Sequence, residues 1–184
     1  MPLDITFTLS DHDLDHFQAV VDKAKLAIAD KATPDDIVAA AGKLIAEARS
    51  ADLPEYIASR LMRLEVIINM LGDTEWKLGE QERARVIGAL TYFCAPEDVI
   101  PDSMPGLGYL DDAIYVELVL RELHAEVTSY EEFCTYRSAE ENRRREKGLD
   151  PRVDREAWLA DKRATLLSTM PKLRKASKRW RLRW

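Results

Sequence analysis

Apolar residues recur along this chain at steps of three and four residues, the period of a helix that buries one face. The clearest case lies between Pro54 and Gly72, where the apolar set is Ile57, Leu61, Leu64, Ile67, Ile68 and Leu71. Proline near the start and glycine at the end are common helix boundaries. The pattern therefore predicts a buried helix between them.

Six further segments combine the helical period with a start or stop signal. We expect helices from Ser10 to about Asp30, Thr33 to about Arg49, about Gly79 to Cys94, Tyr109 to about Val127, Ser129 onward to before Gly148, and Asp154 to Pro171. The start at Ser129 is predicted from a capping box with Glu132. Pro171 is expected to kink or end the last helix.

No partner strand accompanies the short alternating run that ends at Leu9, so we interpret that run as extended coil. The fifth helix is apolar on more than one face, which is typical of a central helix. Beyond Arg137 the sixth helix has no apolar stripe and is expected to extend into solvent. The fold class predicted is all-α, a single helical bundle of about seven helices with a basic C-terminal arm, built around the third, fourth and fifth helices.

At 184 residues the chain is long enough for one well-cored domain with an appended arm. We expect residues 1–148 to form the bundle and residues 149–184 to form the C-terminal helix and arm. Cys94 and Cys134 are not in a CxxC pattern, so a zinc site or disulfide framework has little support. Buried free thiols are expected instead.

The N-terminal residues do not resemble a secretory signal, because Asp4, Asp11 and Asp13 interrupt any apolar run. The longest apolar runs, Val86 to Ala95 and Ala113 to Leu120, are far shorter than the roughly 20 residues that cross a bilayer. We therefore expect a soluble cytoplasmic protein, with peripheral attachment at the inner membrane as the alternative.

The stretch from Ala95 to Asp112, APEDVIPDSMPGLGYLDD, holds three prolines, two glycines and five acidic residues between two apolar helices. Such backbone restriction predicts a built turn rather than a loose connector. The spaced pattern of this stretch consists of Pro96, Asp98, Ile100, Pro101, Asp102, Pro105, Gly106, Gly108, Leu110, Asp111 and Asp112.

With this spacing the segment from about residue 87 to 125 resembles the YkvA-like bacterial proteins, catalogued as domain of unknown function 1232. That family has no assigned activity, so the resemblance names neither a reaction nor a ligand. Many relatives resemble membrane-attached proteins with longer apolar flanks. The charged flanks of this chain favour a soluble one.

The acids of this turn have two competing interpretations. In the structural one, Asp98 and Asp102 accept hydrogen bonds from freed backbone N–H groups, and Asp111 and Asp112 occupy the positive first turn of the fifth helix. In the functional one, Asp98, Asp102, Asp111 and Asp112 are candidate ligands for magnesium or calcium in a hydrolase. We expect no cofactor other than such a divalent cation.

Other chemistry is sparse. His12 and His16 are four residues apart and could hold a metal with a nearby aspartate, although two solvated histidines are the simpler interpretation. His124 is interpreted as a core or capping residue. No serine–histidine–acid order or Walker loop is present, so no catalytic residue is assigned. The corner formed by Met104, Leu107 and Tyr109 is a candidate partner-binding surface.

The C-terminal arm, PKLRKASKRWRLRW from Pro171 to Trp184, has seven basic residues and no acid. The remainder of the chain keeps 20 basic against 33 acidic residues, a formal charge of −13. The candidate partner-binding residues of the arm are Lys172, Arg174, Lys175, Lys178, Arg179, Trp180, Arg181, Arg183 and Trp184. Such a segment suits an anionic membrane surface, nucleic acid or an acidic protein face, including the body of the chain itself.

Together these features favour a non-enzymatic interaction or scaffold module, with a protein partner or self-association as the expected binding mode. The alternatives are a metal-dependent hydrolase that uses the loop carboxylates, and binding to a membrane surface or nucleic acid through the basic arm. Nucleic acid is the weakest of these, because the body is strongly acidic.

Overall fold

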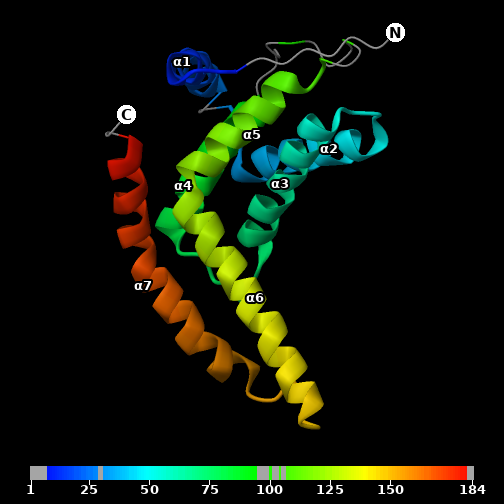
Figure 1. Ribbon diagram of the computed structural model, residues 1–184, viewed down its shortest axis with the longest axis vertical. Coiled ribbons are helices and arrows are strands. Elements are labelled where there is room, and N and C mark those ends of the chain that lie inside the picture. Colours follow the sequence, from blue (N-terminus) through cyan, green and yellow to red (C-terminus); the bar gives the residue numbers. More distant parts are fainter. Residues whose placement is uncertain (1–7, 29–30, 95–99, 101–103, 105–106, 182–184) are drawn as a thin grey trace.

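The computed structural model describes residues 8–28, 31–94, 100, 104 and 107–181, and describes only the backbone of residues 27, 28 and 177–181. Within these residues the chain forms seven α-helices, one short 3-10 helix and no strand, so the predicted all-α class is confirmed (Figure 1). The elements are α1 (Asp11–Ile28), α2 (Pro34–Ser50), α3 (Glu55–Gly72), α4 (Glu80–Leu90), η1 (Thr91–Cys94), α5 (Leu110–Glu122), α6 (His124–Glu146) and α7 (Arg155–Arg181).

The core is centred on α3, as the period of its apolar residues predicts. Leu61, Leu64 and Ile67 are completely buried, because α3 packs against α2 on one side and α5 on another. From α4 and α5, Leu90 and Val116 complete the same core and are also completely buried. The core therefore lies where the sequence places it.

Local signals fix the starts of α1 and α2. Ser10 donates from its backbone N–H and its hydroxyl to Asp13 Oδ2 at 2.8 and 2.6 Å, and Asp13 N–H donates back to Ser10 Oγ at 3.3 Å. Thr33 and Asp36 form the same reciprocal capping box, followed by Pro34 in the first turn of α2. Each box satisfies backbone donors that a helix start leaves unpaired.

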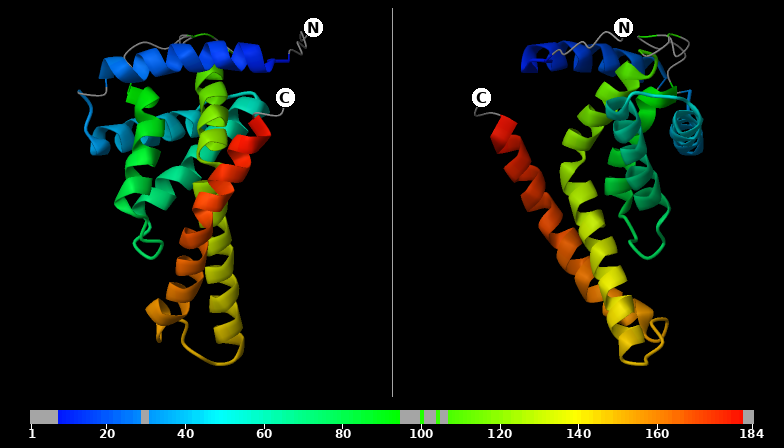
Figure 2. Two further views of the ribbon diagram at one scale, coloured as in Figure 1. Left: turned by 90° about the vertical axis from the view of Figure 1, so that its left-hand side faces the viewer. Right: turned by 45° about the vertical axis from the view of Figure 1, so that its right-hand side comes forward.

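Helix α1 lies across one end of the molecule, over η1 and the start of α5 (Figure 2). Its Val21 is completely buried, and Lys25 Nζ stands 5.3 Å from the centre of the Tyr115 ring. Burial lowers the pKa of Lys25, an effect that Glu122 and Asp22 partly offset. The inner face of α1 is therefore anchored on α5.

The junction between α5 and α6 differs from the prediction. Helix α5 ends at Glu122 and α6 begins at His124, so the expected capping box of Ser129 and Glu132 lies inside α6 and caps nothing. The break occurs at Leu123, which is completely buried and has φ −93° and ψ 17°. A buried leucine carries no stop signal in sequence, which is why the pattern placed the boundary too late.

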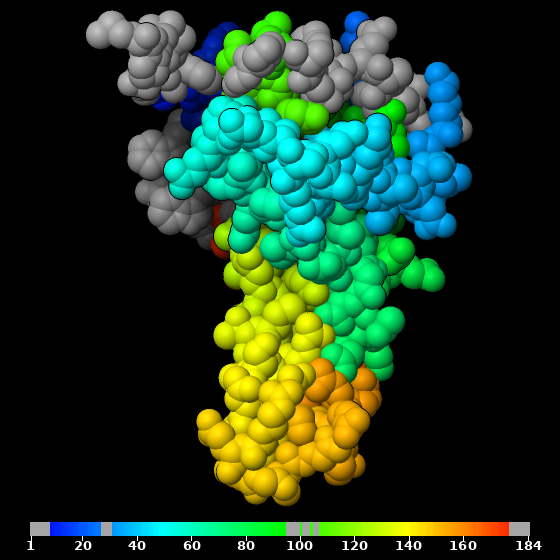
Figure 3. All heavy atoms as spheres, turned by 90° about the vertical axis from the view of Figure 1, so that its right-hand side faces the viewer, coloured from blue at the N-terminus to red at the C-terminus, as the bar shows by residue number. Residues whose placement is uncertain are grey.

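Helices α6 and α7 form a long antiparallel hairpin whose tip projects from the body (Figure 3). The end of α6 was expected to extend alone into solvent. Instead α7 packs along it, and an ion pair joins the two helices, with Arg155 Nη2 2.7 Å from Glu141 Oε1. Helix α7 also continues through Pro171 to Arg181 rather than ending there. Proline removes one helical hydrogen bond, and the exposed position of Pro171 leaves that gap open to solvent.

The connection from α3 to α4 holds the hairpin on the body. Its Trp76 is completely buried, with its ring centre 5.8 Å from that of Tyr130 and 5.1 Å from that of Phe133, both in α6. Arg163 of α7 donates to the backbone oxygen of Glu75 at 2.8 Å. This connection therefore sets the position of both α6 and α7.

Candidate functional site

Near the C-terminal end of α7, Arg174 pairs with two acids of the body. Arg174 Nε donates to Glu126 Oε1 of α6 at 2.7 Å, and its Nη2 donates to Glu82 Oε1 of α4 at 3.1 Å. Arg85 Nε of α4 lies 3.2 Å from the same Glu126 oxygen. Burial acts to lower the pKa of Arg174, but the two carboxylates outweigh it and raise that pKa.

Glu126 is the centre of this cluster. Its side chain is completely buried at the start of α6, where the helix dipole also favours a negative charge. An isolated buried carboxylate is costly, so the two arginines supply the compensation that burial requires. Arg174 therefore stabilises the fold by pairing with Glu126. The sequence predicted only a role in partner binding for this residue.

The neighbours of Arg174 face outward. Lys172, Leu173 and Lys175 are exposed, and neither lysine has an ion-pair partner among the described residues. Of the other arm candidates, Lys178, Arg179, Trp180 and Arg181 belong to α7 with only their backbone described, and Arg183 and Trp184 lie outside the described residues.

The first turn of α5 holds two of the candidate metal ligands. Asp111 is completely buried and Asp112 nearly so. Asp111 Oδ2 accepts a hydrogen bond from the backbone N–H of Ile100 at 3.1 Å and one from the Tyr92 hydroxyl at 3.5 Å. These contacts, and the position in the positive first turn, are those of the structural interpretation.

The other two candidate ligands, Asp98 and Asp102, lie outside the described residues. In the described ranges no three acidic, histidine or cysteine side chains gather as a metal site would require. His12 and His16 are both exposed on α1. His124 was expected to be a core or capping residue. It is exposed at the first position of α6, so the core interpretation is wrong, and α6 has no side-chain cap hydrogen bond; the Nδ1 of His124 lies 3.4 Å from Thr128 Oγ1.

The predicted corner stands immediately before α5. Met104 and Leu107 are exposed, while Tyr109 is half-buried. The Met104 carbonyl accepts hydrogen bonds from the N–H groups of Leu107 and Gly108 at 3.3 and 2.8 Å. Tyr109 has φ 67°, a left-handed conformation that costs energy for a residue with a Cβ and turns the chain into the helix.

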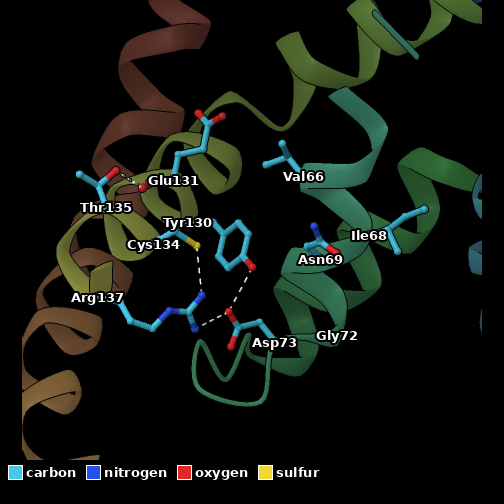
Figure 4. Close-up of a pocket in the computed structure, with 10 residues that line it drawn as sticks. All are labelled: Val66, Ile68, Asn69, Gly72, Asp73, Tyr130, Glu131, Cys134, Thr135 and Arg137. Carbon is cyan, nitrogen blue, oxygen red and sulfur yellow. Dashed lines mark hydrogen bonds and ion pairs between the residues drawn. The ribbon is translucent and has the colours of Figure 1, made fainter. Parts of the chain in front are cut away.

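A groove of about 1030 Å³ lies between α3 and α6 (Figure 4). At its lower edge Asp73 Oδ2 accepts from the Tyr130 hydroxyl at 3.1 Å and from Arg137 Nη1 at 2.8 Å. Arg137 also reaches Cys134 Sγ at 3.5 Å. Cys134 is half-buried and free, as is Cys94, so the two thiols are less buried than expected.

Burial and hydrogen bonding set the pKa values of Asp73 and Tyr130 at the lower edge of the groove. Burial acts to raise the pKa of Asp73, but hydrogen bonds from Arg137 and from the backbone N–H groups of Glu75 and Trp76 outweigh it, and the pKa is lowered. Burial raises the pKa of Tyr130. The groove thus presents a paired carboxylate and a neutral phenol, an arrangement that stabilises the joint between α3 and α6.

Sequence reasoning missed these partners because they are far apart along the chain. Glu126 and Glu82 precede Arg174 by 48 and 92 residues, and Asp73 precedes Arg137 by 64. Neither set forms a motif. A buried acid near the start of a helix is the only local signal, and Glu126 stood inside what the pattern assigned to the end of the fifth helix.

Residues 82–118 match the model of a family described as a protein of unknown function, DUF1232. The chain is also 30% identical over 79 residues to the "uncharacterized membrane protein YkvA" of Bacillus subtilis strain 168. That match covers 40% of this chain and 73% of the relative. The chain belongs to the DUF1232 family. No solved structure is significantly similar to it.

The family match extends from Glu82, which pairs with Arg174, through η1 and the corner to most of α5. DUF1232 membership assigns no activity, since the family is described only by its lack of one. The description of the Bacillus relative places that protein in a membrane. In the described part of this chain, every helix is too short or too polar to cross one.

Proposed function

We propose that this DUF1232 protein is an interaction module that docks on the surface of an anionic membrane through the C-terminal turns of α7, from Lys172 onward. One observation carries the proposal. Within a single turn, Arg174 is held on Glu126 and Glu82 while Lys172 and Lys175 are exposed. In the described part of this segment the body therefore pairs with Arg174 and leaves Lys172 and Lys175 exposed.

The charge pattern supports a lipid surface. From Pro171 to Trp184 there are seven basic residues and no acid, and each Lys or Arg near an anionic bilayer contributes about 1 kcal/mol of attraction. Two or more lysines on a preformed helix can act together without an ordering cost. A flexible tail of the same composition would lose conformational entropy on binding.

The family comparison agrees with attachment at a surface. The Bacillus relative is described as a membrane protein, whereas the described helices of this chain do not meet the length and apolarity needed to span a bilayer. Peripheral docking accommodates both facts. The chain before Pro171 carries a formal charge of −13. Anionic lipid would therefore repel the body and attract the basic end of α7, which orients the molecule with α7 toward the lipid.

The other functions expected from sequence stay predictions. Metal-dependent hydrolysis would require Asp98 and Asp102, which lie outside the described residues, and Asp111 is engaged by Ile100 and Tyr92. A protein partner at the corner and nucleic-acid binding through the arm have no specific contact in their favour.

The proposal is tested by removing the outward charges and keeping Arg174. The double variant Lys172→Ala, Lys175→Ala is expected to bind phosphatidylserine-containing vesicles roughly thirty-fold more weakly than the wild type, because two lysines contribute about 2 kcal/mol. Vesicle sedimentation measures the change. Deleting the whole segment is a poorer test, since it would also remove the partner of buried Glu126.

The matched control is Lys43→Ala, Lys147→Ala, which removes two exposed lysines from α2 and from the hairpin tip. It has the same net charge as the test variant and is expected to bind like the wild type. Equal weakening by both pairs would show that overall charge, and not α7, governs binding, and would contradict the proposal.

A further inference from the structure

Two buried oxygen atoms near the start of α6 have no hydrogen-bond partner among the described residues. They are Oε2 of Glu126 and Oγ of Ser129. The two residues are 0% and 1% exposed, so bulk solvent does not reach either atom. Nearly all buried polar groups in folded proteins are hydrogen-bonded, because a buried group that loses its partner keeps the full cost of leaving water. Both oxygens therefore call for a ligand.

The two residues are neighbours on one face of α6. Side chains three residues apart on a helix have Cβ atoms about 5–6 Å from each other. The Ser129 hydroxyl nevertheless makes no hydrogen bond to the carboxylate of Glu126 or to any other described residue. A small molecule lying between the two side chains could contact both oxygens.

Ser129 differs from other hydroxyl residues in the helical segments of this chain. Thr91 Oγ1 donates to the backbone oxygen of Ile87 at 3.1 Å, and Thr135 Oγ1 donates to that of Glu131 at 2.9 Å. This bond to the preceding turn is the usual way in which a helical serine or threonine satisfies its hydroxyl. Ser129 is more deeply buried than either threonine but makes no such bond. Its hydroxyl is therefore available to another partner.

The charges around Glu126 favour a neutral ligand. Its other carboxylate oxygen, Oε1, lies 2.7 Å from Arg174 Nε and 3.2 Å from Arg85 Nε. Glu82 pairs with the same Arg174, so the two acids and two arginines of this cluster sum to zero formal charge. Neither a cation nor an anion gains net attraction from such a cluster, and either would lose its hydration on burial. The ligand should be small, uncharged, and able both to donate and to accept hydrogen bonds.

We infer that a single buried water molecule bridges Glu126 Oε2 and Ser129 Oγ, beside the ion pairs that join α4, α6 and α7. The water donates a hydrogen bond to the carboxylate and accepts one from the Ser129 hydroxyl. Buried waters commonly connect two to four otherwise unsatisfied polar groups in this way. The water gives Glu126 a third partner besides Arg85 and Arg174. The inference is independent of membrane docking.

The first test is a high-resolution crystal structure of the full wild-type chain. It is expected to show an ordered water within hydrogen-bond distance of both Glu126 Oε2 and Ser129 Oγ. The inference is overturned if no ordered water contacts both atoms. A Ser129 hydroxyl that donates directly to Glu126, or to the backbone oxygen of Ala125 in the preceding turn, would overturn it as well.

The second test uses Ser129→Ala, because the direction of its effect depends on the water. If the hydroxyl holds a water, alanine removes a hydrogen bond and leaves the water with one partner fewer. If the hydroxyl is buried without any partner, alanine removes an unfavourable group and stabilises the fold. Thermal unfolding followed by circular dichroism distinguishes the two cases.

The matched control is Ser168→Ala, at an exposed position of α7 where the hydroxyl donates to the backbone oxygen of Thr165 at 2.8 Å. Both variants gain the higher helix propensity of alanine, so their difference isolates the buried site. Ser129→Ala is expected to melt about 2–4 °C below Ser168→Ala, the shift typical of one lost hydrogen bond in a chain of this size. An equal or higher melting temperature for Ser129→Ala would contradict the inference.

Discussion

Replacing Trp76 by alanine is expected to destabilise the fold by about 3–5 kcal/mol, the usual range when a buried aromatic side chain is truncated in a core. Trp76 is completely buried and packs against Tyr130 and Phe133. Its removal leaves a cavity between the α3–α4 connection and α6. That connection also holds Arg163 of α7, so the cavity is expected to loosen the attachment of both helices of the hairpin.

Chemical denaturation followed by circular dichroism measures the free energy of unfolding. The control is Trp158→Ala, at a half-buried tryptophan that contacts Tyr136 farther along the hairpin, where a smaller loss is expected. A loss below about 1 kcal/mol for Trp76→Ala would mean that the side chain is not in a packed core.

Replacing Arg174 by methionine is expected to destabilise the fold by about 3 kcal/mol, because it leaves the buried carboxylate of Glu126 with one fewer partner. Methionine keeps much of the side-chain length, so the effect isolates the charge. Arg85 stays at 3.2 Å from Glu126, which limits the loss. Vesicle binding should fall as well, since α7 would no longer be held in place.

The double variant Glu126→Gln, Arg174→Met is used to measure the interaction energy between these two side chains apart from their other contacts. If Arg174 acts through Glu126, the double variant is less destabilised than the sum of the two single variants, with a coupling of about 1–2 kcal/mol. Lys175→Met, one residue away and exposed, is the control and should leave stability unchanged. Additive single effects would show that Arg174 and Glu126 do not stabilise each other.

Local patterns predicted most of the fold. The apolar period from Ile57 to Leu71 placed α3, and the cap residues Ser10 and Thr33 placed the starts of α1 and α2, because a helix start is decided within a few residues. The α5–α6 junction at Leu123 could not be predicted in this way. Its break results from packing of a buried leucine, which a pattern of apolar residues cannot distinguish from a continuous helix.

The candidate site was predictable only in part. The first-turn position of Asp111 and the exposure of Met104 and Leu107 follow from local turn chemistry. The basic segment of α7 was visible in composition, but the inward role of Arg174 depends on a glutamate 48 residues away. Tertiary ion pairs of this kind have no sequence period. Only the structure shows that within one turn Arg174 anchors the helix while Lys172 and Lys175 face outward.

That division links packing to the proposed function. Arg174 anchors the helix by pairing with buried Glu126, and the anchored backbone presents Lys172 and Lys175. The same turn would have no fixed direction if the arm were a free tail. A stable body and a presented surface are therefore two consequences of one set of contacts.

The central claim is that the C-terminal turns of α7 dock on anionic lipid. The most direct measurement is the equilibrium binding of the wild-type chain to phosphatidylcholine vesicles with and without phosphatidylserine. We expect binding only to the vesicles with phosphatidylserine, weakening as salt is raised and the lysines are screened. Equal binding to both kinds of vesicle, or binding to neither, would contradict it.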